Sequence, residues 1–428
     1  MVEPLIQQLR KLCSAVIMSF LLGALVACGG SGGGSDNNDA VAGSESITID
    51  VVVRDLVGRD LIIQSSGGDT ITIPENGTHS FETSVDDDGG AVLSVASQPS
   101  EPEQLCVVLD RSSTSTEAEV DCSLLVGYFS DSPVEGLTYT TTSQSGYTDQ
   151  EGRFLYQAGE EISFFVGDMQ IGDSVAAKAH MTPVDIVTGA KLYTRASDIE
   201  RIYNGDLSKQ DETSFNRLHN ILTFLQSIDE DSSSDNGIRI TAEVSALFNG
   251  VSIDFEEDYD DFEDDDNLRR ILNGAANAGL LQYGGILKTM QALDHFYNAQ
   301  GISYSFPIPG YSDVDSDGDG SVDYNQSYDF DSSGGMVADD LTYASGTFYY
   351  YRYTYDRWGN RLSENYMESG SVGDPTKVYT YDNSGNLLSG IEDLDRDGAP
   401  NRIYFYTYDD QGNRLSYTDD SNGDGTAD

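Results

Sequence analysis

Three segments near the C-terminus place oxygen-bearing side chains at alternate positions, with a glycine at position six. These side chains are Asp315, Asp317, Asp319 and Asp323 in the first loop, Asp393, Asp395, Asp397 and Asn401 in the second, and Asp420, Asn422, Asp424 and Asp428 in the third. Calcium takes about six to eight hard oxygen ligands, and oxygens at alternate positions converge on one ion when a glycine permits a sharp turn. The spacing therefore predicts calcium as the cofactor of these loops. The alternative is that they are acidic turns without a metal.

The three loops resemble the calcium loops of EF-hands, dockerins and type 3 thrombospondin repeats at the positions named above. They depart from the EF-hand at position twelve, where that family has a bidentate Glu. Gln326 stands there in the first loop and Tyr404 in the second. The departure implies a weaker affinity than that of an EF-hand sensor, or ligands that come from neighbouring repeats.

A second pattern, Tyr-Thr-Tyr-Asp followed by Gly-Asn, alternates with the loops. It starts at Tyr353, Tyr379 and Tyr406, so the starts are 26 and 27 residues apart. Each unit predicts a strand, a turn at Gly-Asn and a second strand, and stacked hairpins of this kind bury their alternate tyrosines against their neighbours. The pattern resembles the YD repeats of Rhs-type cell-surface proteins, which build long β-sheet surfaces. The connector 369–374 lacks the Asp ladder, so we expect no metal there.

The segments before this repeat region, which spans 306–428, differ in their hydrophobic period. In 46–124, short β-branched runs alternate with turns, which predicts antiparallel strands with a hairpin turn at Asn76-Gly77. The stretch resembles the small β-sandwich modules repeated in bacterial surface proteins, which implies a β-sandwich. Residues 125–182 resemble the carboxypeptidase regulatory-like β-sandwich, a structural or adhesive module without catalytic residues. The resemblance rests on the segments 131–137, 146–154 and 159–164. We expect its core to contain Phe154, Tyr156, Ile162 and Phe164.

A helical period in 183–305 predicts a helical domain. Its acidic segment 229–237 is either a cation loop or a solvated turn, and 254–266 predicts an acidic surface segment anchored by aromatic residues. The chain is thus expected to be multidomain and mainly β. It has two small β-sandwich modules, a helical domain, and a C-terminal β-hairpin repeat region with calcium loops.

The N-terminus predicts export. Arg10 and Lys11 precede an apolar run that ends in Leu-Val-Ala-Cys28, which indicates a signal peptide over 1–27. The tetrapeptide resembles the bacterial lipobox, which implies a lipid on Cys28 and an anchor in the membrane. Gly29 follows Cys28, which in that family favours the outer membrane, with the periplasmic or surface-exposed face left open. Residues 28–45 predict a flexible linker. An ordinary secretory signal cut near Ala27 is the alternative.

Composition limits the partners. Without residues 1–27 the chain has 72 acidic and 21 basic residues, which excludes nucleic acid as a partner. Cys106 and Cys122 remain once Cys13 is removed and Cys28 carries lipid, and a pair of cysteines in an exported protein predicts a disulfide.

The chain is not expected to be an enzyme. Its four histidines lack zinc-ligand spacing, and its only Gly-x-Ser-x-Gly lies in the linker, where no strand-turn-helix can form. Two hypotheses remain. The first is a calcium-binding, surface-anchored lipoprotein with an adhesive or envelope-structural role. The second is a lipid-anchored glycan-binding or glycan-active protein, with Tyr128, Tyr139 or Tyr147 contacting sugar; the partner in either case is a cell-surface glycan or protein.

Overall fold

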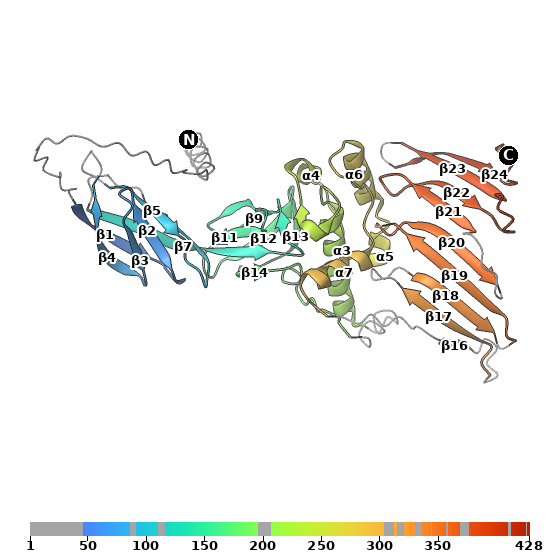
Figure 1. Ribbon diagram of the computed structural model, residues 1–428, viewed down its shortest axis with the longest axis horizontal. Helices are drawn as coiled ribbons and strands as arrows, with labels where there is room; N and C mark the ends of the chain where they lie inside the picture. Colours follow the sequence, from blue (N-terminus) through green and yellow to red (C-terminus); the bar gives the residue numbers. More distant parts are fainter. Residues whose placement is uncertain are drawn as a thin grey trace, which may run out of the picture. The chain divides into compact units, whose positions relative to one another are not determined.

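The computed structural model describes residues 46–85, 91–109, 116–195, 207–303, 312–314, 321–330, 336–343, 345–356, 358–368, 376–409, 412–424 and 426–428. The fold is mainly β, with several sheets, a smaller helical part and a C-terminal antiparallel sheet (Figure 1), which confirms the predicted fold class. The predicted signal peptide, Cys28 and the linker lie outside these residues. Within the described part of the chain, no helix has both the length and the apolar character needed to cross a membrane.

The first β-sandwich packs two sheets over a core of Ile and Val side chains. One sheet contains β1 (Ser46–Arg54), β4 (Gly77–Ser84), β6 (Gln104–Val108) and β7 (Glu117–Phe129). The other contains β2 (Leu61–Ser65), β3 (Thr70–Ile73) and β5 (Leu93–Ser97). Alternate residues such as Ile49, Val51 and Val53 of β1 are buried, as the period of two requires. β1 pairs antiparallel with β4 and parallel with β7.

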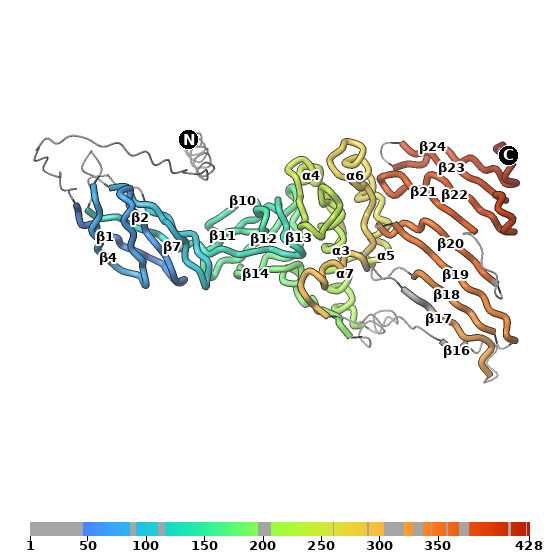
Figure 2. The backbone as a smooth tube through the Cα atoms, viewed as in Figure 1, coloured from blue at the N-terminus to red at the C-terminus, as the bar shows by residue number. Residues whose placement is uncertain are grey.

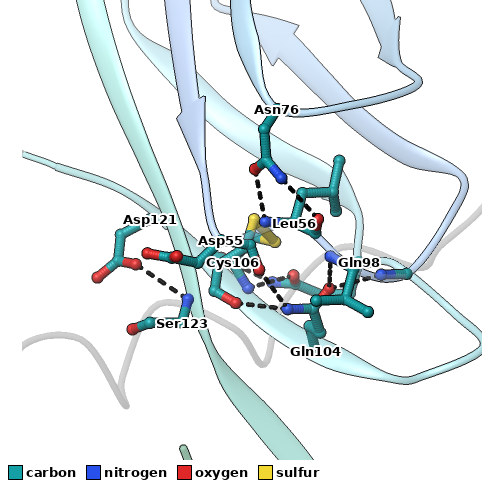
Figure 3. Close-up of a disulfide and its surroundings, with 11 residues drawn as sticks. Asp55, Leu56, Asn76, Gln98, Gln104, Cys106, Asp121 and Ser123 are labelled. Carbon is teal, nitrogen blue, oxygen red and sulfur yellow. Dashed lines mark hydrogen bonds between the residues drawn. A yellow bond between two sulfur atoms is a disulfide. The ribbon is translucent and has the colours of Figure 1, made fainter. Parts of the chain in front are cut away.

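A disulfide and a buried amide hold the first sandwich together (Figure 3). Cys106 of β6 and Cys122 of β7 form the predicted bond, with sulfur atoms 2.02 Å apart. Beside it, the Gln104 amide donates to the Asp55 and Cys122 carbonyls and accepts from the backbone N–H groups of residues 57 and 58. The sequence did not indicate this role for Gln104. Its four bonds fix a loop and a strand to one side chain.

Asn76-Gly77 is not a hairpin turn, and that prediction is wrong. β3 pairs with β2 and β4 pairs with β1, so the turn carries the chain from one sheet to the other. The Asn76 side chain accepts from the Leu56 N–H at 2.7 Å and donates to the Leu56 carbonyl at 2.9 Å. Gly77 still takes a positive φ of 128°. Asn76, by contrast, does not take a positive φ, and the partners of the two strands depend on long-range packing.

The second β-sandwich shares β7 with the first. β11 (Arg153–Tyr156) and β14 (His180–Met181) pair with the C-terminal part of β7. The facing sheet contains β9 (Thr138–Thr140), β10 (Ser145–Tyr147), β12 (Glu161–Val166) and β13 (Met169–Ala176), and β8 (Val134–Glu135) lies outside it. The predicted core residues Phe154, Tyr156, Ile162 and Phe164 are all buried. The predicted boundary at 124/125 lies inside β7, so no linker separates the two sandwiches.

The helical part packs on the second sandwich through one continuous core, which extends from Phe129 to Tyr297. Its helices are α3 (Lys209–Ser227), α4 (Ala242–Ala246), α5 (Tyr259–Phe262), α6 (Asp266–Asn277) and α7 (Thr289–Ala299). The short elements η1 (Ser234–Asn236) and β15 (Ile238–Arg239) follow α3, and β15 pairs with β8. Phe255 and Phe262 are buried and anchor the acidic segment 254–266, as predicted.

The C-terminal region is a nine-stranded antiparallel sheet whose strands follow chain order (Figure 2). Its strands are β16 (Ser312–Val314), β17 (Tyr324–Phe330), β18 (Met336–Tyr343), β19 (Phe348–Tyr355), β20 (Arg361–Glu368), β21 (Lys377–Tyr381), β22 (Leu387–Glu392), β23 (Arg402–Tyr408) and β24 (Arg414–Asp420). Each Tyr-Thr-Tyr-Asp unit forms a hairpin, as predicted. A Thr–Ser hydroxyl bond closes each one: Thr354–Ser363, Thr380–Ser389 and Thr407–Ser416.

Candidate metal centre

The topology brings the second and third Asp ladders to the same edge of the hairpin sheet. Consecutive antiparallel strands run in opposite directions, so every second connection lies at the same end of the strands, which we treat as one edge of the sheet. The first loop joins β16 to β17, the second joins β22 to β23, and the third follows β24. We call this the loop edge. The Asp-x-x-Gly-Asn turns after β19, β21 and β23 lie on the opposite side, which we call the turn edge.

The second loop gathers three carboxylates around one point. Asp393, Asp395 and Asp397 each offer an oxygen, and these oxygens lie within 4.8 Å of one another. Asp393 is half-buried, whereas Asp395 and Asp397 are exposed. Three like charges this close repel one another unless a cation or protons neutralise them. The arrangement is therefore chemically suited to a hard divalent cation such as calcium.

The second and third loops fold with the same internal hydrogen bonds. The side chain at position nine accepts from the N–H at position two: Asn401 from Leu394, and Asp428 from Ser421 at 3.0 Å. The side chain at position five accepts from the N–H at position seven: Asp397 from Ala399 at 2.8 Å, and Asp424 from Thr426 at 2.9 Å. The Thr426 hydroxyl and N–H also hold the pKa of Asp424 below its usual value.

Left-handed backbone geometry occurs at two positions of the second loop and at one described position of the third. Gly398 at position six has φ of 86°, which is the role the sequence predicted for it. Position four is also left-handed, at Arg396 with φ of 60° and at Gly423 with φ of 68°. A Cβ on Gly423 would lie 1.8 Å from the Pro400 carbonyl oxygen. The third loop therefore packs directly on the second, a contact that the sequence did not indicate.

Position twelve does not contribute a ligand. Gln326 donates its amide to Asp339 Oδ1 at 2.9 Å, and Tyr404 is buried with its ring against Tyr406. Of the first loop, Asp315, Asp317 and Asp319 lie outside the described residues, and Asp323 is half-buried just before β17. The metal ligands of that loop thus stay a prediction, as does the connector 369–374, of which no residue is described.

The carboxylates of the turn edge are already occupied by protein donors. Asp356, Asp382 and Asp409 each accept from the N–H and the side-chain amide of the Asn four residues later, at 2.8 to 3.0 Å. The helical part contacts these turns. The rings of Tyr283 and Trp358 stack with centroids 4.7 Å apart, and burial raises the pKa of Tyr283 to about 12.

In the acidic segment 229–237, as at the turn edge, protein groups donate hydrogen bonds to the carboxylates. Asp229 is buried and accepts from the N–H groups of Ser233 and Arg239, both at 2.8 Å. Asp231 accepts from the Ser233 N–H and from the Asn236 amide. Burial raises the pKa of Asp229 to about 6. Protein donors also hold the Asp393 carboxylate, through the N–H groups of Arg396 at 2.6 Å and Gly398 at 3.1 Å, so such bonds do not decide between a turn and a cation loop. Segment 229–237 differs in that, among the described residues, it gathers no group of three carboxylates.

A serine, a histidine and an aspartate meet where the loop 130–133 contacts α7, which sequence reasoning missed. His295 Nε2 lies 3.3 Å from the Ser132 hydroxyl, and its Nδ1 lies 3.7 Å from Asp235. Ser132 is buried and donates to the Ser234 carbonyl, whereas the Asp235 side chain is 95% exposed. These contacts hold the loop against η1 and α7. Ser132 is 163 residues from His295 in sequence and Asp235 is 60 residues from it, so no local pattern signals these contacts.

Comparisons with known proteins identify no family. No family model and no curated protein matches the chain. Among solved structures, a chain of the Photorhabdus luminescens Tc holotoxin pore matches with 19% identity and a TM-score of 0.20. The match covers 24% of this chain and 6% of that one.

Proposed function

We propose that this protein is a calcium-binding lipoprotein of the bacterial outer membrane, anchored through Cys28, with an adhesive or envelope-structural role. The observation that carries the proposal is the convergence of Asp393, Asp395 and Asp397 on the loop edge. Hydrogen bonds shared by the second and third loops support it, and among the described residues the second loop is the one that gathers three carboxylates. The export signal and the resemblance to bacterial surface modules support the location and the role.

Calcium should stabilise the chain against heat. Extracellular calcium modules bind with Kd of about 0.1 to 1 mM, so 10 mM calcium should add about 1.4 to 2.7 kcal/mol per occupied site to the free energy of unfolding. Thermal unfolding of the purified chain with Cys28→Ser, in chelator and in 10 mM calcium, measures this. The double variant Asp395→Asn/Asp397→Asn should lose the part of this calcium-dependent stabilisation that the second loop contributes.

The control for that experiment is Asp261→Asn/Asp266→Asn, which removes the same charge from the exposed acidic segment. Its response to calcium should equal that of the parent. Equal unfolding curves for the parent in chelator and in calcium would end the calcium proposal. Equal losses in both double variants would mean that calcium acts through general charge screening.

The second candidate function, glycan binding, is favoured by one cavity. A cavity of about 320 Å³ lies between the sandwiches, lined by Glu103, Tyr139, Tyr147 and Arg153 among others. Tyr147 is 69% exposed and offers its ring face, while Tyr139 is buried and serves the core. A glycan array probed with the whole chain should then give signals that Tyr147→Ala removes. An array without signals, or signals that Tyr147→Ala leaves unchanged, would reject this candidate.

A further inference from the structure

The cavity between the two sandwiches carries carboxylate oxygens that the described part of the chain leaves without a hydrogen-bond donor. Glu103 accepts from the Tyr128 hydroxyl through Oε2, and its Oε1 is left over. Asp149 accepts from the N–H groups of Glu151 and Arg153 through Oδ1, at 3.0 and 2.9 Å. Its Oδ2 lies 3.8 Å from the Arg153 guanidinium, beyond hydrogen-bond distance. Each of the two carboxylates thus keeps one oxygen for a ligand.

The basic side chain of this wall does not balance the acidic ones. Besides Asp149, the Arg153 guanidinium has Glu151 Oε2 at 3.6 Å. Burial alone would lower the pKa of Arg153, but the charges around it raise that pKa, and three of them are the carboxylates of Asp149, Glu151 and Glu103. One guanidinium therefore faces three carboxylates. The cavity keeps an excess of negative charge, so it suits a cationic ligand better than an anionic one.

The amide side chains that line the cavity serve the first sandwich. Gln98 donates to the Cys106 carbonyl at 3.0 Å and accepts from the Cys106 N–H at 2.8 Å (Figure 3). Gln104 makes the four bonds described above. Because these amides act as structural bridges, the polar groups that face a ligand are mainly carboxylate acceptors. A ligand that fits them supplies hydrogen-bond donors.

Tyr147 adds an aromatic surface to the same cavity. It is 69% exposed, whereas Tyr139 and Phe154, which also line the cavity, are only 5% and 1% exposed. An exposed ring attracts both the C–H groups of a sugar face and a nearby cation, because its π face is negative. An aromatic face in a cavity with free carboxylate oxygens therefore suits a ligand that combines a pyranose ring with an amine.

We propose that the cavity binds an amino sugar with its amine protonated, the sugar ring on Tyr147 and the ammonium at Glu103 Oε1. Asp149 strengthens the negative field there. An ammonium brings three donors and a positive charge, which are the two features that the wall lacks. The inference rests on glycan binding, the second candidate function, and names the class of glycan. An N-acetylated sugar lacks the charge, and a uronic acid would place its carboxylate against Glu103.

Three monosaccharides with the same pyranose ring test this charge preference: methyl glucosaminide, its N-acetyl derivative and methyl glucuronide. Saturation-transfer difference NMR on the whole chain gives a Kd for each at about pH 6, where the amine is protonated, and in about 0.15 M salt, which screens distant charges. The glucosaminide should bind about tenfold more tightly than the N-acetyl form, because a hydrogen bond to a charged group contributes more than a neutral one. The glucuronide should bind most weakly.

Glu103→Gln is the decisive variant, since it keeps an acceptor for the Tyr128 hydroxyl and removes the charge. It should weaken binding of the glucosaminide about tenfold and leave that of the N-acetyl form unchanged, which also shows that the cavity is intact. Asp261→Asn, the matched control, removes one carboxylate from the exposed acidic segment and should keep the parent's preference. Tyr147→Ala should weaken the binding of both sugars to a similar extent.

Equal Kd values for the glucosaminide and its N-acetyl form would overturn the amino-sugar inference, as would no binding of the glucosaminide or a preference that survives Glu103→Gln. Glycan binding itself would still stand if Tyr147→Ala removed the signals of neutral glycans. A blocked lysine amide carries the same charge without a sugar ring and should bind at least about tenfold more weakly. Equal binding of that lysine would show that the cavity takes the side chain of a polypeptide, which also overturns the inference.

Discussion

Replacing Asp131 with Asn is expected to remove most of the loss of stability of this protein between neutral and mildly alkaline pH. The Asp131 side chain is fully buried, and burial raises its pKa from 3.8 to about 8. Gln226 donates to Oδ2 at 2.8 Å, while Oδ1 has no hydrogen-bond partner among the described residues. The folded chain therefore keeps this carboxyl protonated at neutral pH, and Asn is its neutral isostere.

The sign of this pH dependence follows from which state, folded or unfolded, binds the proton. Between pH 3.8 and about 8 the folded chain holds a proton on Asp131 that the unfolded chain has released. The free energy of unfolding therefore falls by about 1.4 kcal/mol per pH unit as pH rises through this window, or about 6 kcal/mol in all. His219 and His295 have the opposite effect, because burial lowers their pKa and the free energy of unfolding then rises with pH. Asp229 has the same effect as Asp131 up to about pH 6.

These opposing groups make pH 7.5 to 8.5 the informative window. Above about pH 7.5 the two histidines are almost fully neutral in both the folded and the unfolded state, so Asp131 should dominate the slope. Urea unfolding at four pH values in this window should give a falling free energy for the parent and a nearly flat one for Asp131→Asn. Asp266→Asn makes the same substitution on a side chain that is 92% exposed and should keep the parent's slope. A parent slope of zero would mean that Asp131 is ionised in the folded chain.

Gly423→Ala should cost several kcal/mol in the third loop and weaken calcium binding by both loops. The added Cβ would meet the Pro400 carbonyl oxygen at 1.8 Å, and φ of 68° disfavours any side chain. Overpacking and left-handed strain together amount to about 2 to 5 kcal/mol. Since Pro400 belongs to the second loop, the displacement should reach the Asp393 site as well.

Gly398→Ala separates the steric contact from the backbone strain. Gly398 has φ of 86°, but a Cβ there would meet nothing within 4 Å, so only the strain of about 1 to 2 kcal/mol applies. Calcium titration calorimetry should show a normal stoichiometry for Gly398→Ala and a reduced one for Gly423→Ala. Equal behaviour of the two variants would show that the packing of the third loop on the second is unimportant for binding.

The local features of the candidate centre could be predicted from the sequence. Alternate Asp residues and a glycine at position six specify a turn through bonds within nine residues, and both described loops have that turn. The Tyr-Thr-Tyr-Asp hairpins are equally local. The packing of Gly423 on Pro400 was not predictable, because it depends on two loops meeting after nine strands have aligned.

Features that join distant segments could not be predicted from the sequence, for the same physical reason. The burial of Asp131 requires Gln226 of α3 to reach the loop 130–133, and a lone Asp in a turn gives no sign of it. The pairing of β3 and β4 with different sheets is decided by which faces are apolar once the sandwich closes. The contacts of His295 could not be predicted because its partners, Ser132 and Asp235, come from other elements.

The continuity of β7 has a mechanical consequence. β1 enters the first sandwich at residue 46 and lies parallel to β7, which leaves the same sandwich toward residue 129. Tension between these two ends pulls parallel neighbours in opposite directions, so their backbone hydrogen bonds are loaded together in shear and do not open one after another. A pulling force on the chain beyond β7 is therefore resisted most strongly in the first sandwich.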